Sequence, residues 1–179
     1  MYDSYYDREF IIVDRFTYLI WSPDRGDVVV FRPHVNKDKE YFIKRIIWIP
    51  GDTVKIEDGK VYLSKKWETS FTELDEGYLS PLSQWSTFVA WKRDSFIYDV
   101  PEWSFFVMGD NRNHSTDSRE CFSSCVWESR TNFIVKSDII GKLFVDLGYF
   151  SFKTFAFKHP NLGIDTTPKW FGSDATWEY

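Results

Sequence analysis

Short apolar runs closed by turn residues constrain the fold of this chain more than any other sequence feature. Each run has the length of a β-strand, and turn-forming or polar residues separate it from the next. Aromatic residues, which favour pleated and half-buried surfaces, make up 20% of the chain. The pattern predicts a mostly β protein whose later strands close a barrel-like sheet, and the first run is expected to be buried. The runs occupy residues 10–13, 28–31, 41–49, 53–57, 60–63, 105–108, 133–135 and 139–145.

One hairpin is specified directly by its turn. Residues 53–57 alternate between apolar and polar side chains, and Asp58 and Gly59 follow as a two-residue turn signal before the apolar run returns at 60–63. An Asp-Gly pair between two such runs is the typical connection of a tight β-hairpin. We therefore expect two antiparallel strands joined at these residues.

The domain organisation is predicted from the segment in which the regular succession of apolar runs and turns is interrupted. The chain has 179 residues, which fits one domain with a modest insertion. Residues 64–99 are more polar and less regular, so they are expected to form a small inserted subdomain. The β core is then residues 1–63 together with 100–149. Residues 150–179 form a C-terminal extension that keeps aromatic side chains but contains no motif.

Charge and hydropathy exclude several classes of protein. The formal net charge is −5, the wrong sign for a protein that binds phosphates, so no nucleic-acid partner is expected. No apolar run reaches the roughly 18 residues needed to cross a bilayer, because Asp14 and Arg15 interrupt the best candidate. The N-terminus also lacks the pattern of a targeting peptide. Any membrane anchor is expected upstream of Met1.

The cysteines and histidines do not form a metal-binding pattern. Cys121 and Cys125 have no further Cys or His at zinc-site spacing, and the three histidines share no suitable spacing, so no metal is expected. A local disulfide between the two cysteines fits an oxidising, extracytoplasmic compartment. Two free thiols are an equally open alternative.

Lys44 is the side chain best suited to acid–base chemistry. It lies between Phe42, Ile43, Ile46 and Ile47, and removing an ammonium group from water favours its neutral form. A neutral amine can act as a general base near neutral pH. The simpler interpretation is an outward-facing strand lysine, because buried lysines are rare.

Two segments resemble conserved motifs of type I signal peptidases. Residues 109–119 match the pattern GDNR-x-x-S-x-DSR at every fixed position. Upstream, Lys44 and Arg45 precede a PGD sequence at 50–52, and an RGD sequence at 25–27 precedes an apolar run, in the family's order. The glycine at position 26 is expected to serve a turn. The resemblance extends from Met1 to about residue 142.

This resemblance implies a Ser/Lys endopeptidase that removes signal peptides from exported proteins without metal or organic cofactor. Lys44 would take the proton from the serine nucleophile, and Ser115 would orient Lys44. Judged by its residue type alone, without the resemblance, Ser115 would be a turn or capping residue. The resemblance further implies a membrane-associated enzyme with an extracytoplasmic catalytic domain. Structural support is expected from an Arg45–Asp110 pair, an Asp117–Arg119 pair and Asn111.

The nucleophile itself is expected outside the given sequence. Alignment of Met1 with the methionine of the family's Ser-Met motif places the serine directly before residue 1, although Asp3 and Ser4 replace the usual Pro-Thr. Ser4 is four positions further on, or roughly 13 Å in an extended chain, which makes it a poor substitute. The chain as given is therefore expected to be inactive. A start assigned at an internal methionine, a fragment and a truly inactive homologue are the explanations left open.

Substrate binding is expected beside the lysine strand, where an extended peptide adds by main-chain hydrogen bonding. The resemblance implies shallow apolar pockets for small residues, although plain core packing is the simpler interpretation of Ile11 and Val30. Two other functions remain open: a self-cleaving repressor type of Ser/Lys peptidase, which the 109–119 motif disfavours, and a non-catalytic peptide-binding β-domain. The expected pocket residues are Met1, Tyr5, Ile11, Val30, Phe42 and Ile43.

Overall fold

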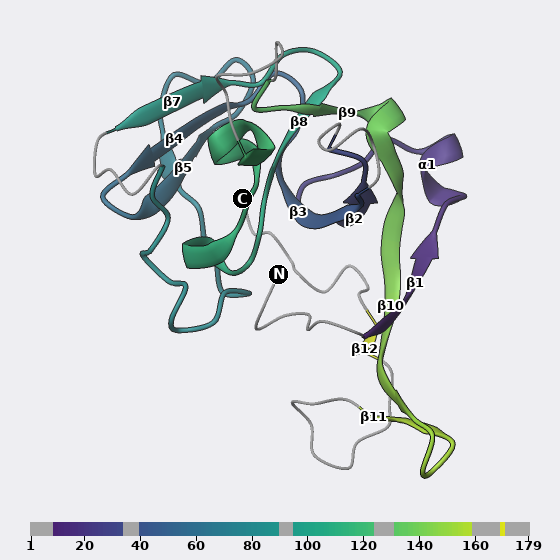
Figure 1. Cartoon of the computed structure of the whole chain (residues 1–179). Coiled ribbons are helices and arrows are strands. Elements are labelled where there is room, and N and C mark those ends of the chain that lie inside the picture. Colours follow the sequence, from purple (N-terminus) through teal and green to yellow (C-terminus); the bar gives the residue numbers. More distant parts are fainter. Residues whose placement is uncertain (1–8, 34–39, 90–94, 124–130, 159–168, 171–179) are drawn as a thin grey trace.

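The chain folds into two antiparallel sheets, as the computed structural model shows for residues 9–33, 40–89, 95–123, 131–158 and 169–170 (Figure 1). The predicted mostly β fold is confirmed. The strands are β1 (Phe10–Asp14), β2 (Val28–Phe31), β3 (Phe42–Trp48), β4 (Thr53–Glu57), β5 (Lys60–Ser64), β6 (Thr72–Glu73), β7 (Phe96–Asp99), β8 (Ser104–Met108), β9 (Ile134–Val135), β10 (Ile139–Ser151), β11 (Ala156–Lys158) and β12 (Lys169–Trp170). The helical elements are α1 (Thr17–Ile20) and the 3₁₀ helices η2 (Arg112–His114), η3 (Ser118–Ser123) and η4 (Lys136–Asp138).

The larger sheet has eight strands and places β3 near its centre. Its order is β1-β10-β2-β3-β8-β9, and β11 and β12 also pair with β10. Strand β2 pairs with the first half of β3, with Val29 opposite Lys44 and Val28 opposite Arg45. Strand β8 pairs with the second half, beginning with Met108 opposite Arg45. Both partners therefore pair with Arg45, on opposite edges of β3, and only β2 reaches Lys44.

The predicted Asp-Gly hairpin joins β4 and β5 and lies in the second sheet, of order β6-β5-β4-β7. Asp58 and Gly59 have φ angles of 50° and 78°, so both turn residues adopt the left-handed conformation that such a hairpin requires. Strands β6 and β7 come from the segment expected to form an inserted subdomain. The hairpin thus shares its sheet with that segment rather than with the larger sheet, and the division into domains stays a prediction.

Strand β1 was predicted to be buried, and this is wrong. Phe10 and Ile12 are 54% and 46% exposed. The strand pairs with β10 alone, and it lies at the end of the strand order. An edge strand has a neighbouring strand on one side only, so fewer side chains cover its own, and the sequence pattern does not say which strand takes the edge.

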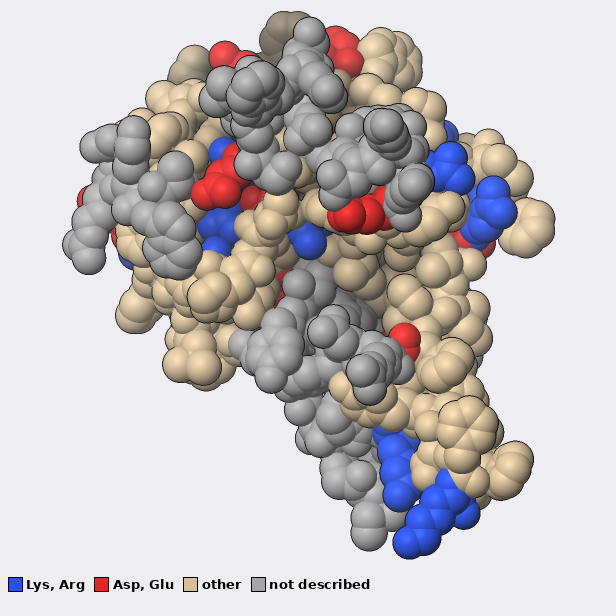
Figure 2. All heavy atoms as spheres, viewed as in Figure 1, with Lys and Arg blue, Asp and Glu red and all other residues tan. Residues whose placement is uncertain are grey.

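Strand β10 runs beyond its predicted end at residue 145 to Ser151 and returns as β11. The resulting hairpin projects from the lower end of the molecule, beyond the other strands of the larger sheet (Figures 1 and 2). A β-bulge at its base, between Phe10 and Ile11 on the partner strand, redirects the strand. Gly148 has a φ of 68° there, and its amide donates to Asp146 Oδ1 at 2.8 Å.

Candidate active site

Lys44 lies on β3 with its side chain turned into the protein. Only 8% of the residue is exposed, which rules out the outward-facing alternative. Its Nζ donates to the carbonyl oxygen of Ile43 at 3.1 Å and lies 5.2 Å from the centre of the Phe42 ring. Burial lowers the pKa of the amine, and this effect outweighs the nearby carboxylates of Asp117 and Asp110, which act to raise it.

Ser115 meets Lys44 across Gly109. A Cβ atom built on Gly109 would lie 2.1 Å from Ser115 Oγ and 3.6 Å from Lys44 Cδ. Only glycine therefore leaves room for the serine side chain beside the lysine. Gly109 was not predicted as a site residue. It is the first residue of the 109–119 motif, which could have pointed to it. The close approach of Ser115 to Gly109 is visible only in the structure.

The hydroxyl of Ser115 is buried and finds no hydrogen-bond partner among the residues that the structure describes. It lies near enough to the Asp117 carboxylate to contribute to the lowered pKa of that group, as the weakest of its causes, but not with the geometry of an ordinary hydrogen bond. No hydrogen bond joins it to Lys44 in this part of the chain. A buried hydroxyl without a partner is costly, and it is free to bond to an amine or a substrate group.

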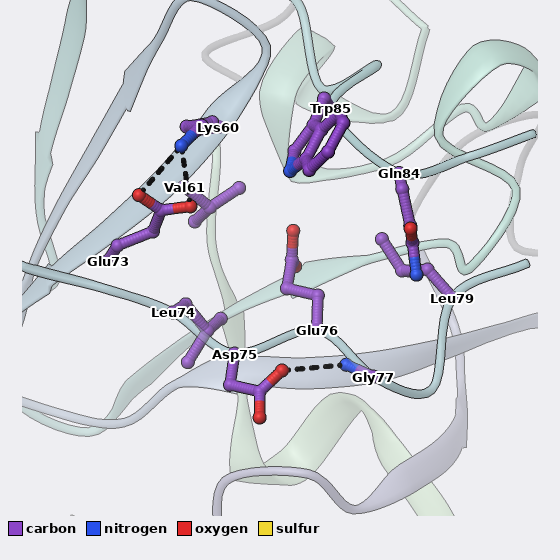
Figure 3. A pocket seen from close by; sticks show the side chains of 10 residues that line it. All are labelled: Lys60, Val61, Glu73, Leu74, Asp75, Glu76, Gly77, Leu79, Gln84 and Trp85. Atoms are coloured by element: carbon purple, nitrogen blue, oxygen red, sulfur yellow. Dashed lines mark hydrogen bonds and ion pairs between the residues drawn. The ribbon is translucent and has the colours of Figure 1, made fainter. Parts of the chain in front are cut away.

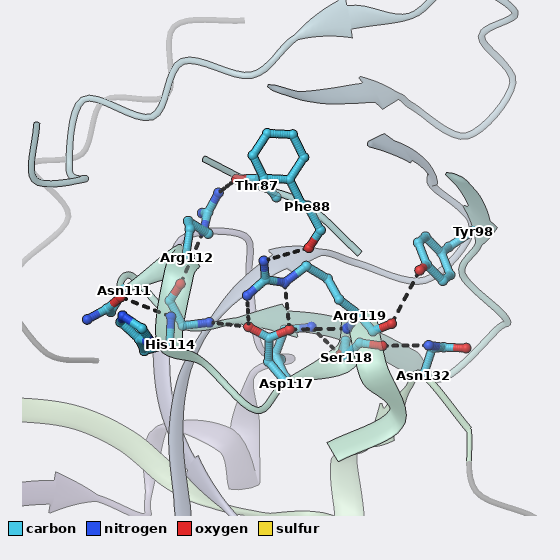
Figure 4. Close-up of polar contacts among 12 residues, drawn as sticks. Thr87, Phe88, Tyr98, Asn111, Arg112, His114, Asp117, Ser118, Arg119 and Asn132 are labelled. Carbon is cyan, nitrogen blue, oxygen red and sulfur yellow. Dashed lines mark hydrogen bonds and ion pairs between the residues drawn. The ribbon is translucent and has the colours of Figure 1, made fainter. Parts of the chain in front are cut away.

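Both ion pairs expected from the family resemblance are present. Arg45 binds Asp110 through two hydrogen bonds, Nε to Oδ1 at 3.0 Å and Nη2 to Oδ2 at 2.9 Å. Arg119 binds Asp117 in the same bidentate manner, with both distances 2.9 Å (Figure 4). Burial would raise the pKa of the Asp117 carboxyl, but the Arg119 guanidinium and the Gly109 amide together hold it below its usual range.

A third buried ion pair was not predicted. Arg25 binds Asp52, with both side chains 4% exposed, and Arg25 Nε donates to the carbonyl oxygen of Ile47 at 3.1 Å. Gly26 has a φ of 88°, which confirms the turn expected at that residue. The pair joins the RGD and PGD sequences on either side of β3. The RGD and PGD sequences occur in the same order in the family, which could have pointed to this ion pair. The sequence alone does not say which of their charged side chains bind each other.

Arg112 ties the motif to the second sheet. Its guanidinium donates to Thr87 Oγ1 at 2.9 Å (Figure 4). It also donates to Tyr78 OH at 2.9 Å and contacts Glu76 Oε1 at 2.6 Å. Arg119 Nη1 likewise donates to the carbonyl oxygen of Phe88 at 3.0 Å. The sequence between β6 and β7 therefore packs directly against the site. Arg112 was also missed, because its partners lie 25 or more residues away.

Asn111 stabilises the loop locally. Its side-chain oxygen accepts a hydrogen bond from the His114 amide at 3.1 Å and so caps η2 (Figure 4). The loop ends in η3, where Cys121 is disulfide-bonded. Cys125, its expected partner, lies outside the described residues.

Three of the four described pocket residues, Val30, Phe42 and Ile43, lie on the β2–β3 pair, and Ile11 lies on β1. Val30 is opposite Ile43, and Ile43 and Ile11 both pack against the small cluster of Val28 and Leu143. Phe42 instead shares the face of Lys44, two residues away. Met1 and Tyr5 lie outside the described residues.

Strand β3 has an unpaired edge beside Lys44. Strand β8 pairs from Arg45 onward, so residues 42–44 have no strand on that side in the part of the chain that the structure describes. An unpaired edge of this kind can accept an extended peptide as an additional strand. It lies next to the buried amine.

Two cavities lie near this region. One, of about 320 Å³, is lined by residues that include Phe88, His114, Ser115 and Arg119. The other, of about 430 Å³, lies over β5 and β6 and is lined by residues that include Lys60, Glu73, Glu76 and Trp85 (Figure 3). The smaller one adjoins Ser115 and is the relevant one for the site. Across the described ranges, no three His, Cys, Asp or Glu side chains are placed to hold a metal ion.

Several known proteins are similar to this chain. Residues 1–147 match the family model described as signal peptidase, peptidase S26. Among similar proteins, "Probable signal peptidase I-2" of Synechocystis is 33% identical over 139 residues, covering 75% of this chain and 53% of its own. "Signal peptidase I S" of Bacillus subtilis is 35% identical over 122 residues, covering 66% and 61%. "Signal peptidase I" of Bacillus caldolyticus is 34% identical over 154 residues, covering 83% and 73%.

The chain spans between about half and three quarters of the length of these relatives. A solved structure of a signal peptidase I from Enterococcus faecalis covers 69% of this chain and 98% of its own at 27% identity, with a TM-score of 0.48.

The contact across Gly109 leads to a first prediction. Gly109→Ala is expected to lower the free energy of unfolding by about 2 kcal/mol, because the added methyl group overlaps Ser115. Adding Ser115→Gly removes the overlapping atoms and is expected to recover most of the loss in a double-mutant cycle measured by urea denaturation. Gly77→Ala is the control, since its new methyl group meets nothing closer than 3.7 Å. Strictly additive effects of the two changes would contradict the proposed contact.

Burial of the Lys44 amine leads to a second prediction. Lys44→Met is expected to stabilise the protein at pH 7 by about 1 kcal/mol, the typical size of a single-residue effect. Because folding lowers the pKa of the amine, the unfolded chain binds more protons between the folded-state pKa and 10.5, and stability rises with pH there. The advantage of methionine therefore shrinks as pH rises towards 10.5. Lys60→Met is the control, because Lys60 bonds to Glu73 and has a raised pKa; a destabilised Lys44→Met protein would refute the assignment.

Proposed function

Because the chain belongs to the signal peptidase family, peptidase S26, we propose that it carries the catalytic domain of a signal peptidase I-like serine endopeptidase that cleaves the signal peptides of exported proteins. The observation that carries the proposal is the buried Lys44 amine, with its lowered pKa, adjoining the partnerless hydroxyl of Ser115. A neutral amine in this position is suited to remove a proton from an alcohol.

The reaction follows from the chemistry of that amine. Lys44 accepts the proton of the serine nucleophile as its oxygen bonds to the scissile carbonyl carbon. The ammonium then donates this proton to the departing amine nitrogen as the C–N bond breaks, which leaves an acyl-serine ester. Lys44 next deprotonates a water molecule, which hydrolyses the ester and restores the serine. By the family motif this serine falls directly before Met1, next to residues 1–8, which lie outside the described residues.

Ser115 positions the amine in this scheme. Its hydroxyl oxygen can accept a hydrogen bond from Lys44, and the fixed loop around it limits where the hydroxyl can go. The Asp110–Arg45 and Asp117–Arg119 pairs hold that loop against β3. A catalytic group needs this kind of support to keep its geometry within fractions of an ångström.

The substrate strand is proposed to add along residues 42–44 of β3. The unpaired edge supplies main-chain donors and acceptors, so recognition does not depend on the sequence of the signal peptide. Alternate substrate side chains then meet Phe42 on one face or the Val30–Ile43 pair on the other. The walls of these positions are large, which favours small substrate residues such as alanine.

The family is membrane-associated, and no helix in the described part of the chain is long and apolar enough to cross a bilayer. We place the catalytic domain on the extracytoplasmic side. The disulfide at Cys121 supports this placement, because disulfides persist in oxidising compartments.

The function is tested by cleavage of a preprotein with the enzyme expressed from its own gene, including any coding sequence that precedes Met1. Cleavage is expected, and Lys44→Ala is expected to reduce it by about 10³-fold or more. The rate is expected to rise with pH through the lowered pKa of Lys44, below 10.5, because only the neutral amine is a base. Lys60→Ala is the matched control, since Lys60 is exposed and bonds to Glu73. Efficient cleavage by Lys44→Ala would refute the mechanism.

Ser115→Ala tests the positioning role separately. We expect a decrease in kcat of about tenfold to a hundredfold, the equivalent of one hydrogen bond to a charged group at roughly 1.5–3 kcal/mol. Thermal unfolding is expected to be unchanged or slightly raised, because the variant loses a buried hydroxyl without a partner. Ser115→Thr keeps the hydroxyl and is expected to retain more activity than the alanine variant. Unchanged turnover in Ser115→Ala would remove this residue from the site.

A further inference from the structure

Phe122 follows the motif loop, residues 109–119, and packs against the strand that carries Lys44. The residue lies in η3 and is 3% exposed. Its ring is edge-on to Phe42, with 6.4 Å between the ring centres, and to Phe31, with 5.6 Å between them. The Phe31 and Phe42 rings contact each other at 6.2 Å. We call these three residues, Phe31, Phe42 and Phe122, the ring triad.

The ring triad lies on the face of β3 that carries the lysine amine. Phe31 on β2 is opposite Phe42, and Val29 is opposite Lys44. Phe42 and Lys44 share a face because they are two residues apart on one strand. The Nζ atom of Lys44 lies 5.2 Å from the centre of the Phe42 ring. Phe42 therefore connects Phe122 to the amine.

The position of Phe122 is fixed by its own segment. Its amide donates to the carbonyl oxygen of Asp117 at 3.0 Å. The preceding residue, Cys121, is 2% exposed and disulfide-bonded. In the same helix, the carbonyl oxygen of Ser118 accepts a hydrogen bond from Asn132 Nδ2 at 2.6 Å (Figure 4). A ring held by such a backbone limits the movement of the ring packed against it.

Burial is the largest cause of the lowered pKa of Lys44, and charged groups do not account for it. Asp117 and Asp110 act to raise this pKa, and Arg119 acts to lower it; all three lie on the motif loop. Strand β2, on the other side, places the uncharged Val29 opposite Lys44. The pKa of the amine therefore depends on how well its apolar neighbours exclude water.

We propose that Phe122 is a positioning residue of the active site, which fixes the Phe42 ring against the Lys44 amine and so keeps water away from that amine. Without the Phe122 ring, Phe42 can turn into the vacated space, and water can bind the Lys44 amine and the Ser115 hydroxyl. Phe122 acts through Phe42 and not on the reacting atoms. The use of the amine as a base rests on the proposed function, whereas the ring contact and its effect on the amine do not.

The first test measures the pKa of Lys44 in the 179-residue chain by NMR of carbon-13-labelled lysine side chains, with Lys44→Met to assign the signal. In Phe122→Ala, the acid dissociation constant of the amine is expected to fall at least about threefold, because hydration favours the ammonium form. Its pKa thereby moves towards 10.5. Phe122→Leu fills more of the space and is expected to give a smaller change in the same direction. It keeps the test valid if the alanine variant does not fold.

Phe106→Leu is the matched control. Phe106 is fully buried, and its ring contacts Trp48, Tyr98 and Phe133 in the other large hydrophobic cluster. This variant is expected to lose stability to urea, as Phe122→Leu does, and to keep the pKa of Lys44 unchanged. The proposal is overturned if folded Phe122 variants leave that pKa unchanged, or if the control raises it equally.

The second test uses the enzyme expressed from its own gene, including any coding sequence that precedes Met1. In Phe122→Ala, the pH dependence of kcat/KM is expected to move to higher pH by at least about threefold in proton concentration, because the base is harder to deprotonate. A residue that only stabilises the fold would lower the rate alike at every pH, and this result would contradict the proposal. If no preprotein is cleaved, the proposed function fails, and the NMR measurement still decides the role of Phe122.

Discussion

The Lys44 amine lies inside a sheet, where burial disfavours its charged form and lowers its pKa. Asp110 and Asp117 are the carboxylates that pull its pKa upward. Each of them is already engaged by an arginine in a bidentate pair, Arg45 and Arg119 respectively. Because both negative charges are balanced locally, desolvation decides the net direction of the shift.

Two arginines of the motif also connect the site to the segment between β6 and β7. Arg119 reaches the Phe88 carbonyl, and Arg112 from the same motif reaches Tyr78 and Thr87. Tyr78 stacks under the Arg45 guanidinium at 4.3 Å, which connects this segment back to the lysine strand. A segment without catalytic side chains thus fixes the loop that carries Ser115.

Sequence predicted the parts of this structure that depend on local chemistry. The β4–β5 hairpin followed from its Asp-Gly turn, and the Arg45–Asp110 pair followed from motif resemblance. The exposure of β1 did not follow, because edge position is decided by the order of strands. Short elements such as α1 and β6 carry too few residues for a periodic signal. The Arg25–Asp52 pair and the space above Gly109 depend on contacts between distant segments.

The site brings two energetic costs together. Lys44 is a buried amine without a carboxylate partner, and Ser115 has a buried hydroxyl without a hydrogen bond. Apolar side chains, such as those of neighbouring Ile46 and Ile47, would avoid both costs. Polar groups kept adjacent at such a cost, across a glycine that makes room for them, indicate selection for chemistry, since local rules of folding are broken mainly at functional sites.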